Sequence, residues 1–206
     1  MIAGILLAAG RGSRFGGDKL LAPLADGRTM IEHSAERFFG AFDNAVCVVR
    51  PQDEVLQTLL DQSGYPWIVA ERAHEGMSQS LVAGVAHWPH ADGWMVGLAD
   101  MPTIETETIV SLRQQLQKPI STDDSATIIV PWFQQSQVRK RGHPVGFSHH
   151  FREELLALQG DEGARSILKS HGDCRVDVEC WDPGILQDVD LPEDIVRLNS
   201  QVSRQN

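Results

Sequence analysis

An apolar run that leads directly into a glycine-rich segment is the feature that most constrains the fold. Residues 2–7 read Ile-Ala-Gly-Ile-Leu-Leu, and the next ten positions contain Gly10, Gly12, Gly16 and Gly17. An uninterrupted apolar strand suits a parallel sheet that is covered on both faces. Glycines let backbone N–H groups approach an anionic ligand, and open α/β sheets bind ligands at the carboxyl ends of their strands. The segment therefore predicts an α/β fold with a phosphate-binding loop.

The rest of the chain repeats the alternation of short apolar runs and helical patterns that is typical of βαβ units. We expect a three-layer, Rossmann-like α/β fold, with a mainly parallel sheet, helices on both faces and a small antiparallel hairpin insertion. The polar, basic residues 134–141 are predicted to form the turn of that hairpin. The expected strands are 2–7, 45–49, 67–70, 94–98, 128–132, 144–147 and 175–178, and the expected helices are 29–39, 53–62, 78–88, one around 109–116, 151–158, 164–170 and 192–202.

Composition narrows the classes of partner. The 206 residues carry a net charge of −10, which gives no general attraction to nucleic acid or to an anionic membrane. No stretch approaches the roughly 20 apolar residues of a membrane span. Three cysteines without a CxxC pair predict neither a disulfide framework nor a zinc site, so the cytoplasm is the expected compartment. An anionic substrate would have to be held by a local positive site or by a metal.

Two common phosphate-binding motifs are excluded in the glycine-rich segment. Phe15 stands where a dinucleotide fingerprint needs its third glycine, and no Gly-Lys-Ser/Thr sequence completes a P-loop. Arg14 and Lys19 could be solvated residues of a surface turn, or fixed cations for phosphates. The pattern L-A-A-G-x-G-x-R-x-G-x-x-K resembles that of the nucleotidyltransferase superfamily with a Rossmann-like fold. The resemblance implies nucleotide binding by Leu7, Ala8, Ala9, Gly10, Gly12, Arg14 and Lys19, with Arg14 and Lys19 also catalytic.

Two aspartates are the candidate metal ligands. Asp100 follows the strand expected at 94–98, in a Leu-Ala-Asp-Met-Pro sequence that resembles the metal-binding segment of the same superfamily, which also implies a catalytic role. Asp190 lies in Asp-Val-Asp-Leu-Pro-Glu-Asp, which resembles a second metal-binding segment, with Leu191 where threonine is usual. Asp190 with Glu193 is also a capping-box pattern for the last helix, and Asp188 is the alternative ligand. One or two carboxylates with substrate phosphates suit Mg²⁺.

Three further segments are similar to the molybdenum-cofactor cytidylyltransferases. Residues 76–84 resemble the element that approaches the base and ribose, which implies nucleotide contacts for Gly76 and Ser80. Residues 141–147 and 160–165 resemble the segments that border the acceptor pocket. The resemblance implies acceptor binding by Gly142, His143, Pro144, Asp161, Gly163 and Arg165. It covers most of the chain and implies one nucleotidyltransferase domain at 1–202, with a nucleotide-binding half at 1–117, an acceptor-binding half at 118–202 and a frayed tail at 203–206.

The expected reaction is a Mg²⁺-dependent transfer of CMP from CTP to the terminal phosphate of molybdopterin, with release of pyrophosphate. CTP is suggested by Ala9, because the guanylyltransferases of the group tend to have glycine there. GTP, another phosphorylated small molecule as acceptor, and a non-catalytic cofactor carrier for a molybdenum hydroxylase stay open as alternatives. A nicotinamide oxidoreductase is disfavoured by Phe15.

Overall fold

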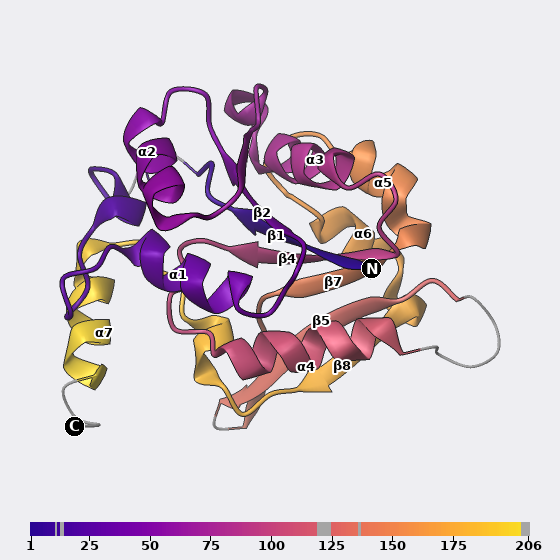
Figure 1. Ribbon diagram of the computed structural model, residues 1–206. Coiled ribbons are helices and arrows are strands. Elements are labelled where there is room, and N and C mark those ends of the chain that lie inside the picture. The colour runs from indigo at the N-terminus through magenta and orange to yellow at the C-terminus, as the bar shows by residue number, and fades with distance from the viewer. Residues whose placement is uncertain (11, 13–14, 119–124, 136, 203–206) are drawn as a thin grey trace.

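The computed structural model describes residues 1–10, 12, 15–118, 125–135 and 137–202, and it is built around one eight-stranded sheet (Figure 1). The strand order is β3-β2-β1-β4-β7-β5-β6, and β8 pairs with β5. The strands are β1 (Ile2–Leu7), β2 (Ala45–Val49), β3 (Trp67–Val69), β4 (Gly93–Leu98), β5 (Ile128–Gln135), β6 (Val138–Arg141), β7 (Val145–Ser148) and β8 (Arg175–Glu179).

One half of the sheet is parallel. β1 lies between β2 and β4, and its residues are almost completely buried, which explains why the run 2–7 is apolar on both faces. Leu7 is in register with Val48 on one side and with Leu98 on the other. The carboxyl ends of these strands therefore meet at one rim of the sheet. The segments that follow them begin side by side.

The other half is mixed. β7 runs antiparallel to β4 and to β5, whereas β8 runs parallel to β5. The expected hairpin insertion is confirmed, but its turn is shorter than predicted, because Val138–Arg141 forms a strand that pairs with the end of β5. All four side chains of this strand are exposed, so its polar, basic sequence reflects solvent on its surface and not a turn. The amino end of β7 faces the carboxyl end of β4, since Val145 pairs with Val96.

Helices cover both faces of the sheet and give two apolar cores. The first core lies under α1 (Met30–Phe39), α2 (Glu54–Ser63), α4 (Thr106–Gln117) and α7 (Pro192–Val202). The second lies under α3 (Met77–His87), α5 (Arg152–Leu156) and α6 (Arg165–Ser170). A sheet with helices on both faces was the predicted fold class, and it is confirmed. In the described residues no helix is long and apolar enough to span a bilayer.

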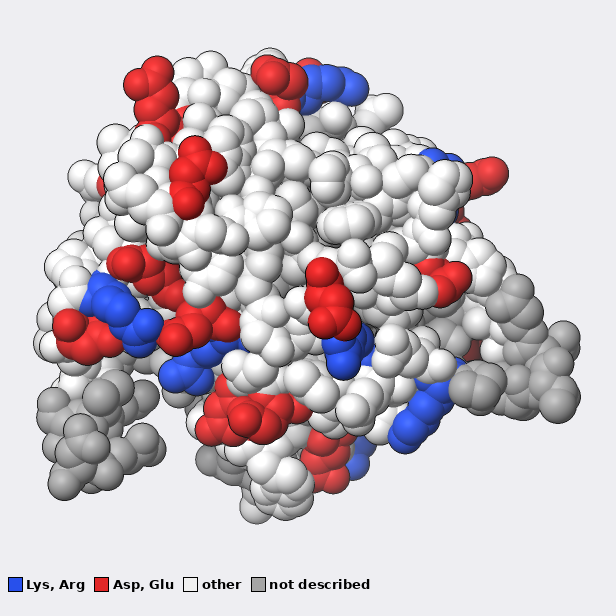
Figure 2. All heavy atoms as spheres, viewed as in Figure 1, with Lys and Arg blue, Asp and Glu red and all other residues white. Residues whose placement is uncertain are grey.

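Short 3-10 helices complete the fold: η1 (Lys19–Leu21), η2 (Ala73–Glu75), η3 (His149–Phe151), η4 (Gly172–Cys174) and η5 (Pro183–Leu186). Figure 2 shows one face of the molecule, on which acidic and basic side chains are interspersed over several elements. The coloured residues of this face form no broad basic surface, in agreement with the net charge of −10.

Candidate functional site

The rim at the carboxyl ends of β1 and β4 brings together three charged residues that are distant in sequence. Lys19 Nζ donates to Asp100 Oδ2 at 2.7 Å and to Asp190 Oδ1 at 3.2 Å. The side chain of Lys19 is only 10% exposed, against 22% for Asp100 and 47% for Asp190. The two candidate metal ligands therefore share one cation, and all three groups open onto the same cleft.

Main-chain contacts hold the two aspartates next to one another. Val189 N–H donates to the Asp100 carbonyl at 3.0 Å, which ties the segment before α7 to the turn after β4. That turn is anchored from the other side, because Ser34 Oγ on α1 donates to the Ala99 carbonyl at 2.7 Å. A main-chain hydrogen bond thus brings Asp100 and Asp190 close together although they are far apart in the sequence.

The capping-box pattern predicted around Asp190 takes another form. The final helix begins at Pro192, so Asp190 lies before the cap position, and its carboxylate receives Lys19. Asp194 Oδ2, and not Glu193, accepts the N–H groups of Asp190 and Leu191, at 3.1 and 2.9 Å. Asp194 therefore takes over the stabilisation of the helix start. These contacts lower the pKa of Asp194.

In the triad of Lys19, Asp100 and Asp190, the positive charge of the Lys19 ammonium group balances part of the negative charge of the two carboxylates. Burial alone would lower the pKa of Lys19, but the two carboxylates offset it and the net shift is upward from 10.5. Lys19 is therefore fully charged near neutral pH. Asp100 Oδ1 is buried and has no hydrogen-bond partner among the described residues. A buried carboxylate oxygen without a donor, beside a second carboxylate, is a donor set that fits a divalent cation with oxygen ligands.

The cleft around this triad has a volume of about 620 Å³ and is lined by all the described residues that the sequence proposed for nucleotide and metal except Asp188, the alternative ligand. Its lining combines the main chain after β1 with the start of α3. The predicted residues in it are Leu7, Ala8, Ala9, Gly10, Gly12, Lys19, Gly76, Ser80, Asp100 and Asp190. Arg14 lies outside the described residues, so its predicted role stays a prediction.

A second ion-pair set that sequence reasoning missed holds the glycine-rich segment to β2. Arg50 follows β2, and its guanidinium pairs with Asp18 at 3.0 Å and with Asp53 at 3.0 Å. Asp18 immediately precedes Lys19 in the chain. Arg50 also lines a slot of about 170 Å³ beside Ala9, together with Gln52, Glu71 and His74. The position of Arg50 directly after an apolar strand was the available signal.

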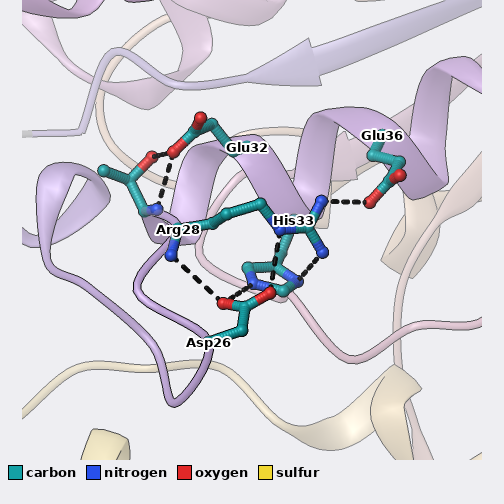
Figure 3. A network of polar contacts seen from close by, with 6 residues as sticks. Asp26, Arg28, Glu32, His33 and Glu36 are labelled. Carbon is teal, nitrogen blue, oxygen red and sulfur yellow. Dashed lines mark hydrogen bonds and ion pairs between the residues drawn. The ribbon is translucent and has the colours of Figure 1, made fainter.

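The segment after Lys19 is fixed by a surface network at the start of α1 (Figure 3). Arg28 bridges Asp26 and Glu36 at 2.8 and 2.7 Å, and His33 contacts Asp26 at 2.9 Å. Contacts with Arg28 and His33 lower the pKa of Asp26. Beside this network, Glu32 closes the predicted capping box by accepting from the Thr29 N–H at 2.7 Å. The segment between η1 and α1 is thus tied to α1.

A second cleft, of about 660 Å³, lies against the sheet face that α3 and α6 cover. It shares Leu7, Met77, Leu98 and Asp161 with the cleft around the triad, so the two clefts adjoin. Five of the six residues that the sequence proposed for the acceptor line it: Gly142, His143, Asp161, Gly163 and Arg165. The sixth, Pro144, faces the other side of the sheet and lines a small pocket with residues of α1 and α4.

His143 is a half-buried member of this cleft. Its N–H donates to the Ile185 carbonyl at 3.0 Å, and its side-chain Nδ1 is buried without a partner among the described residues. Burial lowers the pKa of His143, while the charge of Asp100 opposes that shift. The imidazole is therefore neutral at neutral pH, with one ring nitrogen as a hydrogen-bond donor and the other as an acceptor.

The elements that line the two clefts also bind each other. Ser78 N–H donates to the Gly160 carbonyl at 3.1 Å, and the buried Gln79 side chain donates to the Leu158 carbonyl at 3.0 Å. At Gly76, whose φ is +125°, a Cβ atom would lie 2.4 Å from the Gly160 oxygen. Glycine is required there both for the backbone angle and for the close approach. The start of α3 is thus locked to the turn that carries Asp161.

Fold and site together define a class: this is a nucleotidyltransferase with a Rossmann-like fold. The MobA-like NTP transferase domain family matches residues 4–175, and the chain belongs to that family.

Two curated relatives span nearly the whole chain. The nicotine blue oxidoreductase of Paenarthrobacter nicotinovorans is 30% identical over 202 residues, which is 96% of each protein. The purine catabolism protein PucB of Bacillus subtilis strain 168 is 28% identical over 95% of this chain and 96% of its own length. Among solved structures, Rv0371c of Mycobacterium tuberculosis in complex with manganese has a TM-score of 0.72 and 24% identity, over 97% of this chain and 98% of that one. At that identity the likeness shows the fold.

Proposed function

We propose that this protein transfers CMP from CTP to the terminal phosphate of molybdopterin in the cytoplasm, with Mg²⁺ as cofactor and release of pyrophosphate. The observation that carries the proposal is the convergence of Lys19, Asp100 and Asp190 on a cleft that opens into a second one. The first cleft has the glycine-rich main chain that a triphosphate needs. The second offers space for the molecule that receives the nucleotide.

The proposed reaction needs no general base. A phosphate monoester has a second pKa of about 6, so the acceptor is already an anionic nucleophile near neutral pH. Catalysis then rests on placing it in line with the α-phosphorus and on stabilising charge. Lys19 would leave its carboxylate partners to contact the phosphates, and Arg14 is proposed to do the same. A divalent cation held by Asp100 and Asp190 would supply charge neutralisation and a fixed geometry for the phosphates.

The unpaired Asp100 Oδ1 supports this metal assignment, as does the manganese in the complex of the similar Rv0371c structure. Mg²⁺ is the proposed physiological ion, since it is bound through few carboxylates and the substrate's own phosphates.

The slot beside Ala9 supports a choice of nucleobase. Its lining includes Glu71 and Gln52, and a carboxylate can accept a hydrogen bond from the exocyclic amine of cytosine. We therefore expect Glu71→Gln to weaken discrimination between CTP and the other nucleotides, without changing the metal requirement.

The decisive experiment incubates the protein with molybdopterin, Mg²⁺ and each of the four NTPs, and measures both pyrophosphate and the dinucleotide product. CTP alone should give both in equal amounts. Product formation with GTP in place of CTP would show that GTP is the nucleotide substrate. Turnover only with other phosphorylated acceptors would show that molybdopterin is not the acceptor.

A second candidate comes from the name of the 30% identical relative, which describes an oxidoreductase. Phe15 interrupts the glycine pattern of a dinucleotide fingerprint, which argues against a nicotinamide site of that type. Titration with NADH and with a flavin tests this candidate directly.

A carrier role, in which the protein holds the cofactor for a molybdenum hydroxylase, would show as tight cofactor binding without pyrophosphate release.

A further inference from the structure

The second cleft has an apolar floor that is set by strand register. Leu7, Val96, Leu98, Val130 and Val145 all line it. They lie on four neighbouring strands, and the register pairs Leu7 with Leu98 and Val96 with Val145. Side chains on one face of a sheet alternate with period two, so these five form one continuous apolar surface. A compact apolar or aromatic body fits this floor.

Cations line the part of this cleft that the nucleotide cleft does not share. Arg165 and Lys169 are four residues apart on α6, so both project from the same side of the helix, and both line the cleft. Neither has an ion-pair partner among the described residues. Arg141 and Arg175 line the cleft as well and share Asp177, at 3.4 and 3.0 Å. Such a group is unexpected in a chain with a net charge of −10.

Strand register separates the far cations from the reacting rim. Arg175 pairs with Ile128, Ile128 with Phe147, and Phe147 with Trp94. Arg175 is therefore level with Trp94, four residues before Leu98 at the rim, which is roughly 13 Å along the strands at about 3.3 Å per residue. β8 is also three strands away from β4, roughly 14 Å across the sheet. The acidic residues of the cleft, Asp161 and Glu162, lie instead on the turn that is locked to α3.

From this separation we propose that the acceptor carries two anionic groups on an apolar body: a phosphate that reacts at the rim, and a second anion that Lys169 and Arg175 bind at the far end of the cleft. This inference rests on the proposed function, which places the reacting phosphate of the acceptor at the rim. It adds the residues that would select the acceptor. Arg165 lies one helical turn from Lys169 on the same helix. An acceptor with a phosphate alone would leave Lys169 without an ion-pair partner among the described residues and Arg175 paired only with Asp177.

Equilibrium binding without any NTP tests the inference separately from turnover. The probes are biphenyl-4-yl phosphate and its 4′-carboxy derivative, with phenyl phosphate and 4-carboxyphenyl phosphate as the shorter pair. Affinities are measured by calorimetry on the full chain. In at least one pair the added carboxylate should tighten binding by about tenfold, as expected for a charge-assisted contact with Arg175, whose side chain is 22% exposed.

The variants Lys169→Gln and Arg175→Gln should each remove most of that gain and leave the affinity for the singly charged probe nearly unchanged. Lys118→Gln is the matched control, because Lys118 is exposed at the end of α4 and does not line the cleft. No gain from the carboxylate in either pair, or a gain that survives both variants, overturns the inference. If the gain is present but no nucleotide is transferred, the second-anion site stands and the proposed reaction fails.

Discussion

The two adjoining clefts are built in different ways. The proposed nucleotide cleft is lined by two segments in which alanine and glycine recur, the loop after β1 and the residues around the start of α3, together with Leu98, Asp100, Asp161 and Asp190. The second cleft is lined by long side chains that come from α6, β5, β6, β7 and β8. Backbone N–H groups bind phosphates that every NTP carries, whereas dispersed side chains distinguish one small molecule from another. We infer that the first cleft fixes the reaction and the second fixes the acceptor.

Substitution of Asp100 should have the largest effect, and this effect should be on the rate of the reaction and not on the choice of acceptor. Asp100→Asn keeps the shape but removes the charge on the carboxylate with the unpaired oxygen. We expect kcat to fall by at least about 10³-fold with any acceptor, because charge stabilisation by a metal contributes several kcal/mol. Pyrophosphate release measures it. Asp173→Asn, at an exposed site in η4, is the control, and activity of Asp100→Asn within tenfold of that control would remove Asp100 from the mechanism.

A substitution of Lys19 tests whether this residue both pairs with the two aspartates in the nucleotide-free protein and stabilises charge during the reaction. Lys19→Met should lower kcat by roughly 10²–10³-fold, by analogy with the loss of one charge-stabilising donor. Because Lys19 occupies both carboxylates, its removal should leave Mn²⁺ binding to the nucleotide-free protein unweakened or tighter. Electron paramagnetic resonance of free Mn²⁺ measures that binding. Weaker Mn²⁺ binding in Lys19→Met would mean that the lysine organises the metal site instead of competing for it.

Gly76 tests the contact that joins the two clefts. Gly76→Ala forces a Cβ against the Gly160 carbonyl at a φ of +125°, which should cost about 1–3 kcal/mol of stability. For a chain of this size that corresponds to roughly 2–12 °C in Tm. Gly172→Ala is the matched control, since no atom lies within 4 Å of the added Cβ. Equal Tm values for the two variants would show that the turn at Gly160 moves freely. A loss of stability with a higher KM for both substrates would show that the clefts are coupled.

Sequence predicted the parallel half of the sheet and the nucleotide cleft well, because both depend on local signals. The apolar strand 2–7 and the glycines after it form one continuous pattern, and Gly10 and Gly12 of that pattern line the cleft together with Leu7, Ala8, Ala9 and Lys19. The contact of Lys19 with Asp190 was not predictable from spacing alone. It depends on the backbone bond between Val189 and Asp100, which joins segments that are far apart in the chain.

The second cleft was predicted less completely, for the same physical reason that makes it selective. Arg141 opens the segment 141–147 but was given no role of its own, and Lys169 and Arg175 stand in no motif and are ordinary for a surface helix or strand. Only the pairing of β8 with β5 and of β6 with β5 brings two of them to one side of the sheet. Pro144 shows the reverse case, since it belongs to a recognisable motif but faces the opposite core. Alternation along an extended segment sends neighbouring side chains to opposite faces.

The smallest expected effect is on stability, and it comes from His143 in the second cleft, whose burial makes the free energy of unfolding depend on pH. Its folded-state pKa is lower than its ordinary value of 6.5 because the ring is buried. As pH falls below 6.5 the unfolded chain takes up a proton that the folded chain does not, so this residue makes stability fall with pH, by at most about 1.4 kcal/mol per unit. Chemical denaturation from pH 7.5 to 5 should show a shallower decline in His143→Gln than in the native chain, whereas His90→Gln, at an exposed turn, serves as the control. Equal slopes in all three proteins would mean that the ring is protonated without cost, and that the second cleft admits water around His143 as freely as the nucleotide cleft does around Asp190.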